Sequence, residues 1–173
     1  TLAWERAPFI ISSVIPVILI SLRWCLALIG LAFSREGCEI ICNKFGFLYY
    51  PIIAHAVGAK VVFSNKNSLI VDESDIVKKV SKKTNIVFLA NPNNPTGFIV
   101  EKKRLVRMLK KIPPHVIVVI DGAYAEYVEE KGFSDGLELV KSFPNVVVTR
   151  TFSKIYAMAG LRLGWAYSSK EVI

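Results

Sequence analysis

The chain has 173 residues, of which 53% are hydrophobic, and this is enough to bury the core of one domain. Lysine and arginine outnumber aspartate and glutamate by 22 to 14, but the excess lies in clusters on segments with an amphipathic helical pattern, which is typical of solvated outer faces. No recognised nucleic-acid-binding module and no basic stripe interleaved with aromatic residues accompanies the charge, so we expect no nucleic-acid partner.

The N-terminal region contains an uncharged, mostly apolar run over residues 7–22 that is interrupted by Arg23 and contains Pro16. A membrane-spanning helix needs about 20 apolar residues, and a charge near the middle counts against one. For this N-terminal region we therefore favour a buried helix plus a strand. A membrane segment is the alternative. A signal peptide is disfavoured because Glu5 precedes the run and no small-residue cleavage site follows it.

Beyond this region, apolar strand-like runs alternate with amphipathic helix-like segments, without a linker between them. Strands are predicted over 39–42, 60–63, 86–90, 116–121, 146–149 and 163–167, and helices over 73–82, 101–111 and 134–142, the last with Leu137 and Val140 facing inward. Such alternation predicts a single α/β domain with a mostly parallel sheet and helices on both of its faces.

The first candidate functional residue in chain order is Asn94, in the sequence Asn-Pro-Asn-Asn-Pro-Thr-Gly over 91–97. This turn cluster directly follows the predicted strand that ends at Ala90. An asparagine in such a turn offers both a donor and an acceptor to a ligand. An ordinary strand-to-helix turn is the alternative interpretation.

A second candidate is Asp121, which directly follows five apolar residues over 116–120. This run predicts a strand that is hydrophobic on both faces, with Asp121 at its carboxyl end. A carboxylate in that position is costly unless a cation or hydrogen bonds compensate it. Tyr124, three residues later, could direct its phenol to the same place. The alternative is an aspartate that caps the next helix.

The third candidate is Lys154, in Thr-Phe-Ser-Lys over 151–154, just past the strand predicted from Val146. Ligands bind at the carboxyl ends of strands in open α/β sheets. A lysine can act as a nucleophile when burial or nearby cations lower its pKa. Arg162 follows in an otherwise apolar setting, and we expect it to be buried. Taken alone, a lysine such as Lys154 would more often be an ordinary surface residue.

Together the three segments resemble the fold-type I enzymes that depend on pyridoxal 5′-phosphate (PLP), and within them the class II aminotransferases of the histidinol-phosphate aminotransferase type. Residues 45–51 and 54–59 resemble the segment that carries the family's ring-stacking aromatic residue. The resemblance implies the large domain of that fold, a three-layer α/β/α arrangement. It extends from about residue 28, so residues 1–27 diverge and 1–173 is expected to be a partial PLP-binding large domain without the C-terminal small domain.

The resemblance also implies a set of residues around the cofactor: Phe45, Asn94, Asp121, Tyr124, Thr151, Ser153, Lys154 and Arg162. Lys154 would bind the cofactor covalently and move the α-proton of the substrate. Asp121 would pair with the pyridine nitrogen and keep it protonated.

The other members of this set would orient the cofactor. Asn94 and Tyr124 would hydrogen-bond the phenolic oxygen of the ring, and Phe45 would stack on the ring face. The phosphate would be bound by Thr151, Ser153 and Arg162. No metal site is expected.

The function implied by the resemblance is transamination between an amino acid and a 2-oxo acid, with L-histidinol phosphate and 2-oxoglutarate as the substrates, in histidine biosynthesis. The full-length family is expected to form homodimers. Alternatives are a threonine-phosphate decarboxylase, an aromatic-amino-acid aminotransferase, and a truncated relative without catalysis. Three cysteines without metal or redox spacing predict reduced thiols and a cytoplasmic location.

Overall fold

The computed structural model describes residues 17–65 and 67–172. Its strands form one seven-stranded sheet in the order β1-β7-β6-β5-β4-β2-β3. The bounds are β1 (Val17–Leu19), β2 (Glu39–Asn43), β3 (Lys60–Ser64), β4 (Thr84–Ala90), β5 (Ile117–Asp121), β6 (Val146–Thr151) and β7 (Gly164–Tyr167). Every strand that the sequence predicted within these ranges is present, with ends that differ by a few residues.

The sheet is parallel from β3 to β6, and β7 and β1 add two antiparallel strands at one edge. The inner parallel strands β2, β4, β5 and β6 are buried on both faces, which accounts for their apolar runs, whereas the edge strand β3 is only partly buried. β7 can be antiparallel to β6 because the chain returns through a loop at the same end of the sheet. The prediction of a mostly parallel sheet is therefore confirmed.

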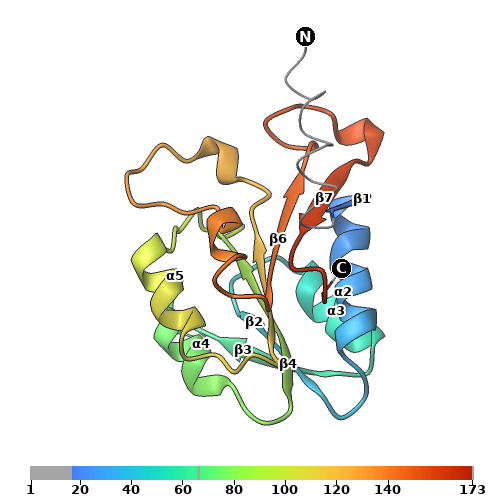
Figure 1. Ribbon diagram of the computed structural model, residues 1–173, viewed down its shortest axis with the longest axis vertical. Helices are drawn as coiled ribbons and strands as arrows, with labels where there is room; N and C mark the ends of the chain where they lie inside the picture. Colours follow the sequence, from blue (N-terminus) through green and yellow to red (C-terminus); the bar gives the residue numbers. More distant parts are fainter. Residues whose placement is uncertain (1–16, 66, 173) are drawn as a thin grey trace.

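Helices cover both faces of the sheet, as Figure 1 shows. On one face lie α2 (Leu22–Phe33) and α3 (Tyr49–Ala56), and on the other lie α4 (Glu73–Lys79) and α5 (Lys102–Leu109). Short 3-10 turns are η2 (Ala125–Tyr127), η3 (Leu137–Leu139) and η4 (Ala159–Leu161). This is the predicted three-layer α/β/α arrangement.

Alternation along the strands sorts side chains into two cores. On β4, Ile86 and Phe88 pack with residues of α2 and α3, whereas Val87 and Leu89 pack with residues of α4 and α5. Burial of each such side chain contributes about 1.5–3 kcal/mol. The same alternation on β5 places Asp121 on the face of α2 and α3, because Val119, two residues earlier, belongs to that core.

The helix predicted over 134–142 is wrong, because this segment contains only the 3-10 turn η3. The hydroxyl of Ser134 accepts a hydrogen bond from the amide of Gly136 at 3.1 Å, and Gly136 has a φ of 90°. Such a local hydrogen bond and a left-handed residue compete with the start of an α-helix. Val140 is nevertheless buried, as predicted.

In the N-terminal region, the predicted strand and helix are present as β1 and α2, while the expectation for residues 7–16 lies outside the described residues. Of the helices in the described ranges, none combines the length and the apolarity required to cross a membrane.

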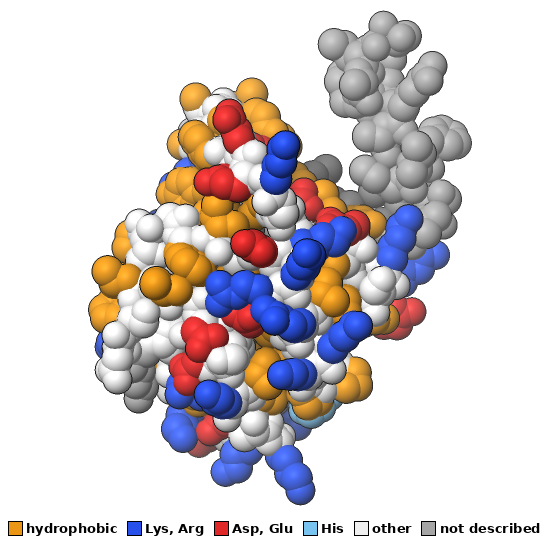
Figure 2. Space-filling model, turned by 90° about the vertical axis from the view of Figure 1, so that its left-hand side faces the viewer, with side chains coloured by type: hydrophobic (Ala, Val, Ile, Leu, Met, Phe, Trp, Pro, Cys, Tyr) orange, Lys and Arg blue, Asp and Glu red, His pale blue; other side chains and the backbone are white. Residues whose placement is uncertain are grey.

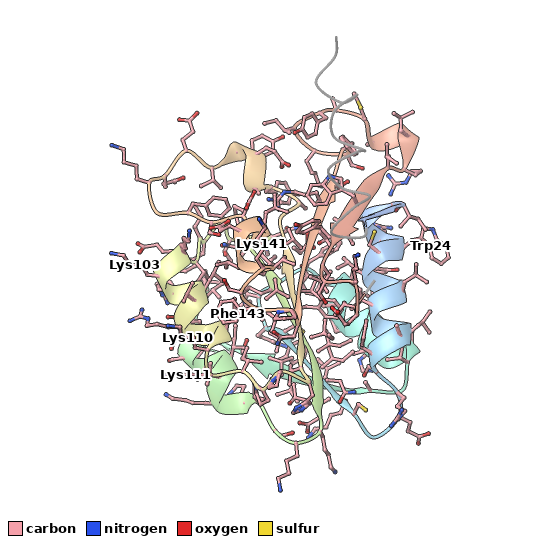
Figure 3. All side chains as sticks on the ribbon, viewed as in Figure 1. Trp24, Lys103, Lys110, Lys111, Lys141 and Phe143 are labelled. Carbon is pink, nitrogen blue, oxygen red and sulfur yellow. The ribbon has the colours of Figure 1, made fainter. Side chains whose placement is uncertain are left out.

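The basic clusters lie mainly on the outer layer formed by α4 and α5. Figure 2 shows Lys and Arg side chains on this side of the molecule, interspersed with Asp and Glu. Lys103, Lys110 and Lys111 point away from α5 (Figure 3), whereas Leu105 and Met108 of the same helix are buried. The amphipathic pattern thus corresponds to an outward polar face, as predicted.

Candidate functional site

The site is built at the carboxyl edge of the parallel strands. Ala90 of β4, Asp121 of β5 and Thr149 of β6 lie side by side in register. The amide of Asn91 donates to the carbonyl of Asp121 at 2.9 Å, and the amide of Gly122 donates to that of Thr149 at 3.0 Å. The chain order reverses next to β2, since β3 lies on one side of it and β4 on the other. Open sheets bind ligands in the crevice at such a reversal.

A cavity of about 50 Å³ lies at this edge. Four of the predicted site residues line it, Asn94 after β4, Asp121 and Tyr124 at the end of β5, and Lys154 after β6. The remaining lining residues are Leu22, Phe47, Tyr50, Ala90, Pro92 and Ala123. Side chains from three separate segments of the sequence are therefore brought to one place.

Asp121 is the buried charge of the site, with 3% of its surface exposed. Its Oδ1 accepts a hydrogen bond from the amide of Ala123 at 3.1 Å, and its Oδ2 accepts one from the hydroxyl of Tyr50 at 2.8 Å. Burial raises the pKa of Asp121 above its ordinary value, although the hydrogen bonds from Tyr50 and Ala123 oppose that effect. The hydrogen bonds that the sequence led us to expect are present, but they offset the effect of burial only in part.

Lys154 reaches the same cavity from the other side. Its Nζ lies 4.9 Å from the centroid of the Tyr124 ring, in a cation–π contact. The residue is exposed. The reason is its position three residues beyond β6, on a connection to β7 whose other residues are also largely exposed.

The loop after β4 is held in shape by its asparagines. Asn91 is fully buried; its side chain accepts from the amide of Val100 at 2.8 Å and donates to the carbonyl of Val100 at 3.1 Å. Asn93 donates to the carbonyl of Phe45 at 2.8 Å, which joins this loop to the segment after β2. These bonds fix the ends of the loop that carries Asn94 to the cavity.

The three residues expected to bind a phosphate do not line the cavity. Thr151 is buried, and its hydroxyl accepts from the amide of Ser153 at 3.1 Å. Arg162 is exposed, and its guanidinium donates to the carbonyl of Ala159 at 2.7 Å. The expectation of a buried Arg162 is wrong because its apolar neighbours, among them Leu161, are themselves exposed.

Two aromatic residues at the cavity were missed from the sequence. Phe45, expected to stack on a ring, is 39% exposed and does not line the cavity, whereas Phe47 does. Tyr50 enters the site from the first turn of α3. Their spacing of three residues at the start of a helix places both on one side of it, and this is the signal that could have identified them.

The chemistry of these groups fits the ring end of PLP. A buried carboxylate suits a protonated ring nitrogen, an amide and a phenol suit an oxygen, and an amine suits a carbonyl carbon. The cavity that these groups line is small, at about 50 Å³, and Lys154 lies on its exposed side.

Comparisons with known proteins agree with this arrangement. Residues 25–173 match the family described as aminotransferase class I and II. The chain is 47% identical over 147 residues to the histidinol-phosphate aminotransferase of Rhodospirillum centenum, which covers 85% of this chain and 41% of that protein. It is also 47% identical over 141 residues to that of Pelagibacter ubique, covering 82% and 39%. The chain thus spans about two fifths of the length of these relatives.

Solved structures give the same result for the fold. The histidinol-phosphate aminotransferase of Sinorhizobium meliloti, solved in complex with pyridoxal 5′-phosphate, superposes with a TM-score of 0.83 at 25% identity, over 90% of this chain and 43% of that one. The enzyme of Clostridium acetobutylicum gives 0.82 at 26% identity, over 92% and 47%. The predicted fold class is confirmed by these structures.

Proposed function

This chain belongs to the class I and II aminotransferases, and from that premise we propose that it is part of the PLP-binding large domain of an aminotransferase. The observation that carries the proposal is the convergence of Asp121, Tyr124, Asn94 and Lys154 on one cavity. The proposed substrates are L-histidinol phosphate and 2-oxoglutarate, because the relatives described above at 47% identity are histidinol-phosphate aminotransferases.

The residues of the cavity have separate roles in this proposal. When bound, the cofactor supplies an electron-withdrawing ring that stabilises negative charge at the substrate α-carbon. Asp121 holds a proton on the ring nitrogen by offering it a carboxylate. Tyr124 and Asn94 donate hydrogen bonds to the ring oxygen. Lys154 would hold the carbonyl carbon of the cofactor through its amine. Once the amino group of the substrate has replaced it there, the freed amine would accept the α-proton of the substrate and deliver it to that carbon of the cofactor.

The remaining contacts are proposed from the segments that flank the cavity. Thr151, Ser153 and Arg162 bind the phosphate, and this requires the segment between β6 and β7 to close over it. Phe47, which lines the cavity, takes the position against the ring that the sequence had suggested for Phe45.

The assembly and location are also part of the proposal. We expect a homodimer, and exposed apolar side chains are available for it on α2, with Trp24 and Leu31, and just before α3, with Leu48, each more than 60% exposed. Light scattering of the purified chain measures its mass directly. A cytoplasmic location is consistent with three free cysteines, Cys25, Cys38 and Cys42.

Cofactor binding tests the proposal most directly. Addition of PLP is expected to produce a visible absorbance band, and borohydride reduction is expected to fix the cofactor to Lys154, which peptide mass spectrometry identifies. The Lys154→Ala variant should lose the band, whereas Lys170→Ala, which alters another exposed lysine, should keep it. Absence of a band in the wild-type chain at saturating PLP would instead indicate a relative without catalysis.

Substrate identity requires a second measurement on the cofactor-loaded protein. Histidinol phosphate is expected to change the visible spectrum, and 2-oxoglutarate to restore it. A change with phenylalanine but not with histidinol phosphate would indicate an aromatic-amino-acid aminotransferase. Release of carbon dioxide from threonine phosphate would indicate a decarboxylase.

A further inference from the structure

The hydroxyl of Tyr50 makes a direct hydrogen bond to the buried carboxylate of Asp121, across 71 positions of the sequence. The distance from Oη to Oδ2 is 2.8 Å, and Tyr50 and Asp121 are 1% and 3% exposed. Of the side chains around Asp121, Tyr50 lowers the pKa of the carboxyl most, ahead of Thr149 and Arg150. A bond of this kind to an ionised acceptor is about twice as strong as a neutral one.

The ring of Tyr50 is fixed in position by its neighbours. It stacks on Phe88 with a centroid distance of 4.8 Å and an interplanar angle of 4°. The ring of Phe47 meets it edge to face, at 5.5 Å and 89°. Tyr50 and Phe88 are buried and Phe47 is partly buried, so the hydroxyl cannot turn toward solvent without breaking the stacked contact. The donor is therefore preorganised.

In the pair formed by Tyr50 and Asp121, the proton of the hydrogen bond stays on the phenol of Tyr50. Burial, followed by the charge of Asp121, raises the pKa of Tyr50 well above its ordinary value, so the phenol keeps its proton. Burial also raises the pKa of Asp121, and the hydrogen bond from Tyr50 is the largest effect that lowers it. Tyr50 thus acts as a permanent donor that favours the charged form of a carboxylate that burial disfavours.

The carboxylate keeps acceptor capacity after these contacts. Two oxygens offer about four lone-pair directions, and the bonds from Tyr50 and Ala123 use two of them. Asp121 and Tyr50 both line the cavity that also contains Lys154. The remaining capacity is available to a donor that enters this cavity.

We propose that Tyr50 is a positioning residue that keeps Asp121 ionised and in one orientation toward the ring nitrogen of the cofactor. The inference rests on the proposed function, and it adds a residue that touches neither the substrate nor the reacting atoms. Tyr50 acts through Asp121, and Phe47 and Phe88 hold it in place. Without the hydroxyl, the carboxylate would accept a proton more readily and would hold the ring-nitrogen proton less strongly.

The test compares Tyr50→Phe with Tyr49→Phe. The first variant keeps the stacked ring and removes only the hydroxyl that binds Asp121. The second makes the same change on the neighbouring residue, for whose hydroxyl the described residues offer no hydrogen bond. We expect the dissociation constant of PLP to rise about tenfold in Tyr50→Phe, as for the loss of about 1.4 kcal/mol, and to stay within twofold of the wild type in Tyr49→Phe.

A second readout distinguishes positioning from a general loss of structure. With PLP labelled with ¹⁵N in the ring, nuclear magnetic resonance follows the protonation of the ring nitrogen against pH. In Tyr50→Phe this nitrogen should lose its proton at a lower pH than in the wild type. Incorporation of 3-fluorotyrosine at position 50, which keeps the ring and makes the phenol a stronger donor, should move the titration in the opposite direction; this variant replaces Tyr50→Phe if the latter does not fold.

The outcomes separate the two proposals. An unchanged ring-nitrogen titration in both position-50 variants, with a wild-type chain that binds PLP, overturns the role of Tyr50 and leaves the proposed function intact. Failure of the wild-type chain to bind PLP overturns both.

Discussion

Gly122 and Arg150 occupy positions that depend on each other. A Cβ atom built on Gly122 would overlap the guanidinium of Arg150, which is buried directly against it. Gly122 follows Asp121 at the end of β5, so the absence of a side chain there allows a large cation to pack beside the candidate site. Arg150 in turn pairs with Asp135 at 2.8 Å and with Glu126 at 3.5 Å.

Replacement of Gly122 by alanine should therefore destabilise the chain. The added methyl group forces the guanidinium out of its position, and overpacking of this kind costs about 1–3 kcal/mol. Urea denaturation of Gly122→Ala measures the loss. Gly160→Ala is the matched control, because no heavy atom lies within 4 Å of the Cβ built there. Equal stability of the two variants would contradict the packing argument.

Removal of the Arg150 charge should also be costly. In Arg150→Met the apolar stem is retained and can still pack against Trp165, whose ring lies 5.7 Å from the guanidinium, but Asp135 and Glu126 lose their cation. Loss of one partner of a buried pair costs about 3–5 kcal/mol, and since both carboxylates are partly solvated we expect about 2 kcal/mol. Thermal unfolding, with exposed Lys103→Met as the control, measures the effect. A melting temperature equal to that of the wild type would show that the ion pairs contribute nothing.

In the absence of cofactor, the buried carboxylate of Asp121 should make the chain less stable as the pH rises. Its folded-state pKa is raised, chiefly by burial. The stability linked to this group is therefore fully present below its ordinary pKa and is lost as the pH rises through the folded value. Asp121→Asn does not titrate, so its unfolding free energy relative to the wild type should increase from pH 3.5 to pH 7.

Urea unfolding at several pH values tests this expectation. Glu129→Gln, which alters an exposed carboxylate, serves as the control and should show no such trend. A difference between Asp121→Asn and the wild type that is constant with pH would mean that burial does not perturb Asp121.

Glu73 should show the opposite dependence on pH. Burial raises its pKa, but the hydrogen bonds and charge of Arg104, whose Nε lies 2.8 Å from Oε2, outweigh burial and hold the pKa below its ordinary value. This contribution is present above the ordinary pKa and is lost as the pH falls through the folded value. Glu73→Gln should lower the free energy of unfolding, measured by urea denaturation, by about 1 kcal/mol at pH 7 and leave it unchanged at strongly acidic pH. The control Glu36→Gln, which alters an exposed residue, should leave it unchanged at both pH values. The same cost at both pH values would refute the ion-pair explanation.

The sequence predicted most of the fold because its strands are buried on both faces and therefore appear as continuous apolar runs. The run that leads to Asp121 also marked the carboxyl edge of the sheet, and with it the ring end of the candidate site. The 3-10 turn at Leu137–Leu139 was missed because the apolar spacing is compatible with a helix, while the competing hydrogen bond of Ser134 depends on three-dimensional geometry.

Other features depend on contacts that no local pattern contains. In the sequence, Tyr50 looks like one more apolar residue of α3. The acceptor of its hydroxyl is Asp121 of β5, which comes close only in the folded chain. Arg162 was expected to be buried because the residues around it are apolar, but those residues are themselves exposed and do not cover it. Burial is a property of the tertiary arrangement, so composition around a residue is weak evidence for it.

The antiparallel turn from β6 to β7 has a mechanical consequence. The segment between them starts and finishes at one pair of hydrogen-bonded residues, since the amide of Phe152 donates to the carbonyl of Leu163 at 3.1 Å. Lys154 and Arg162 therefore lie on the same connection between β6 and β7, whose two ends meet at the edge of the sheet. Both side chains are therefore carried by one connection whose two ends the sheet fixes, and a change in its conformation would displace the amine and the guanidinium together.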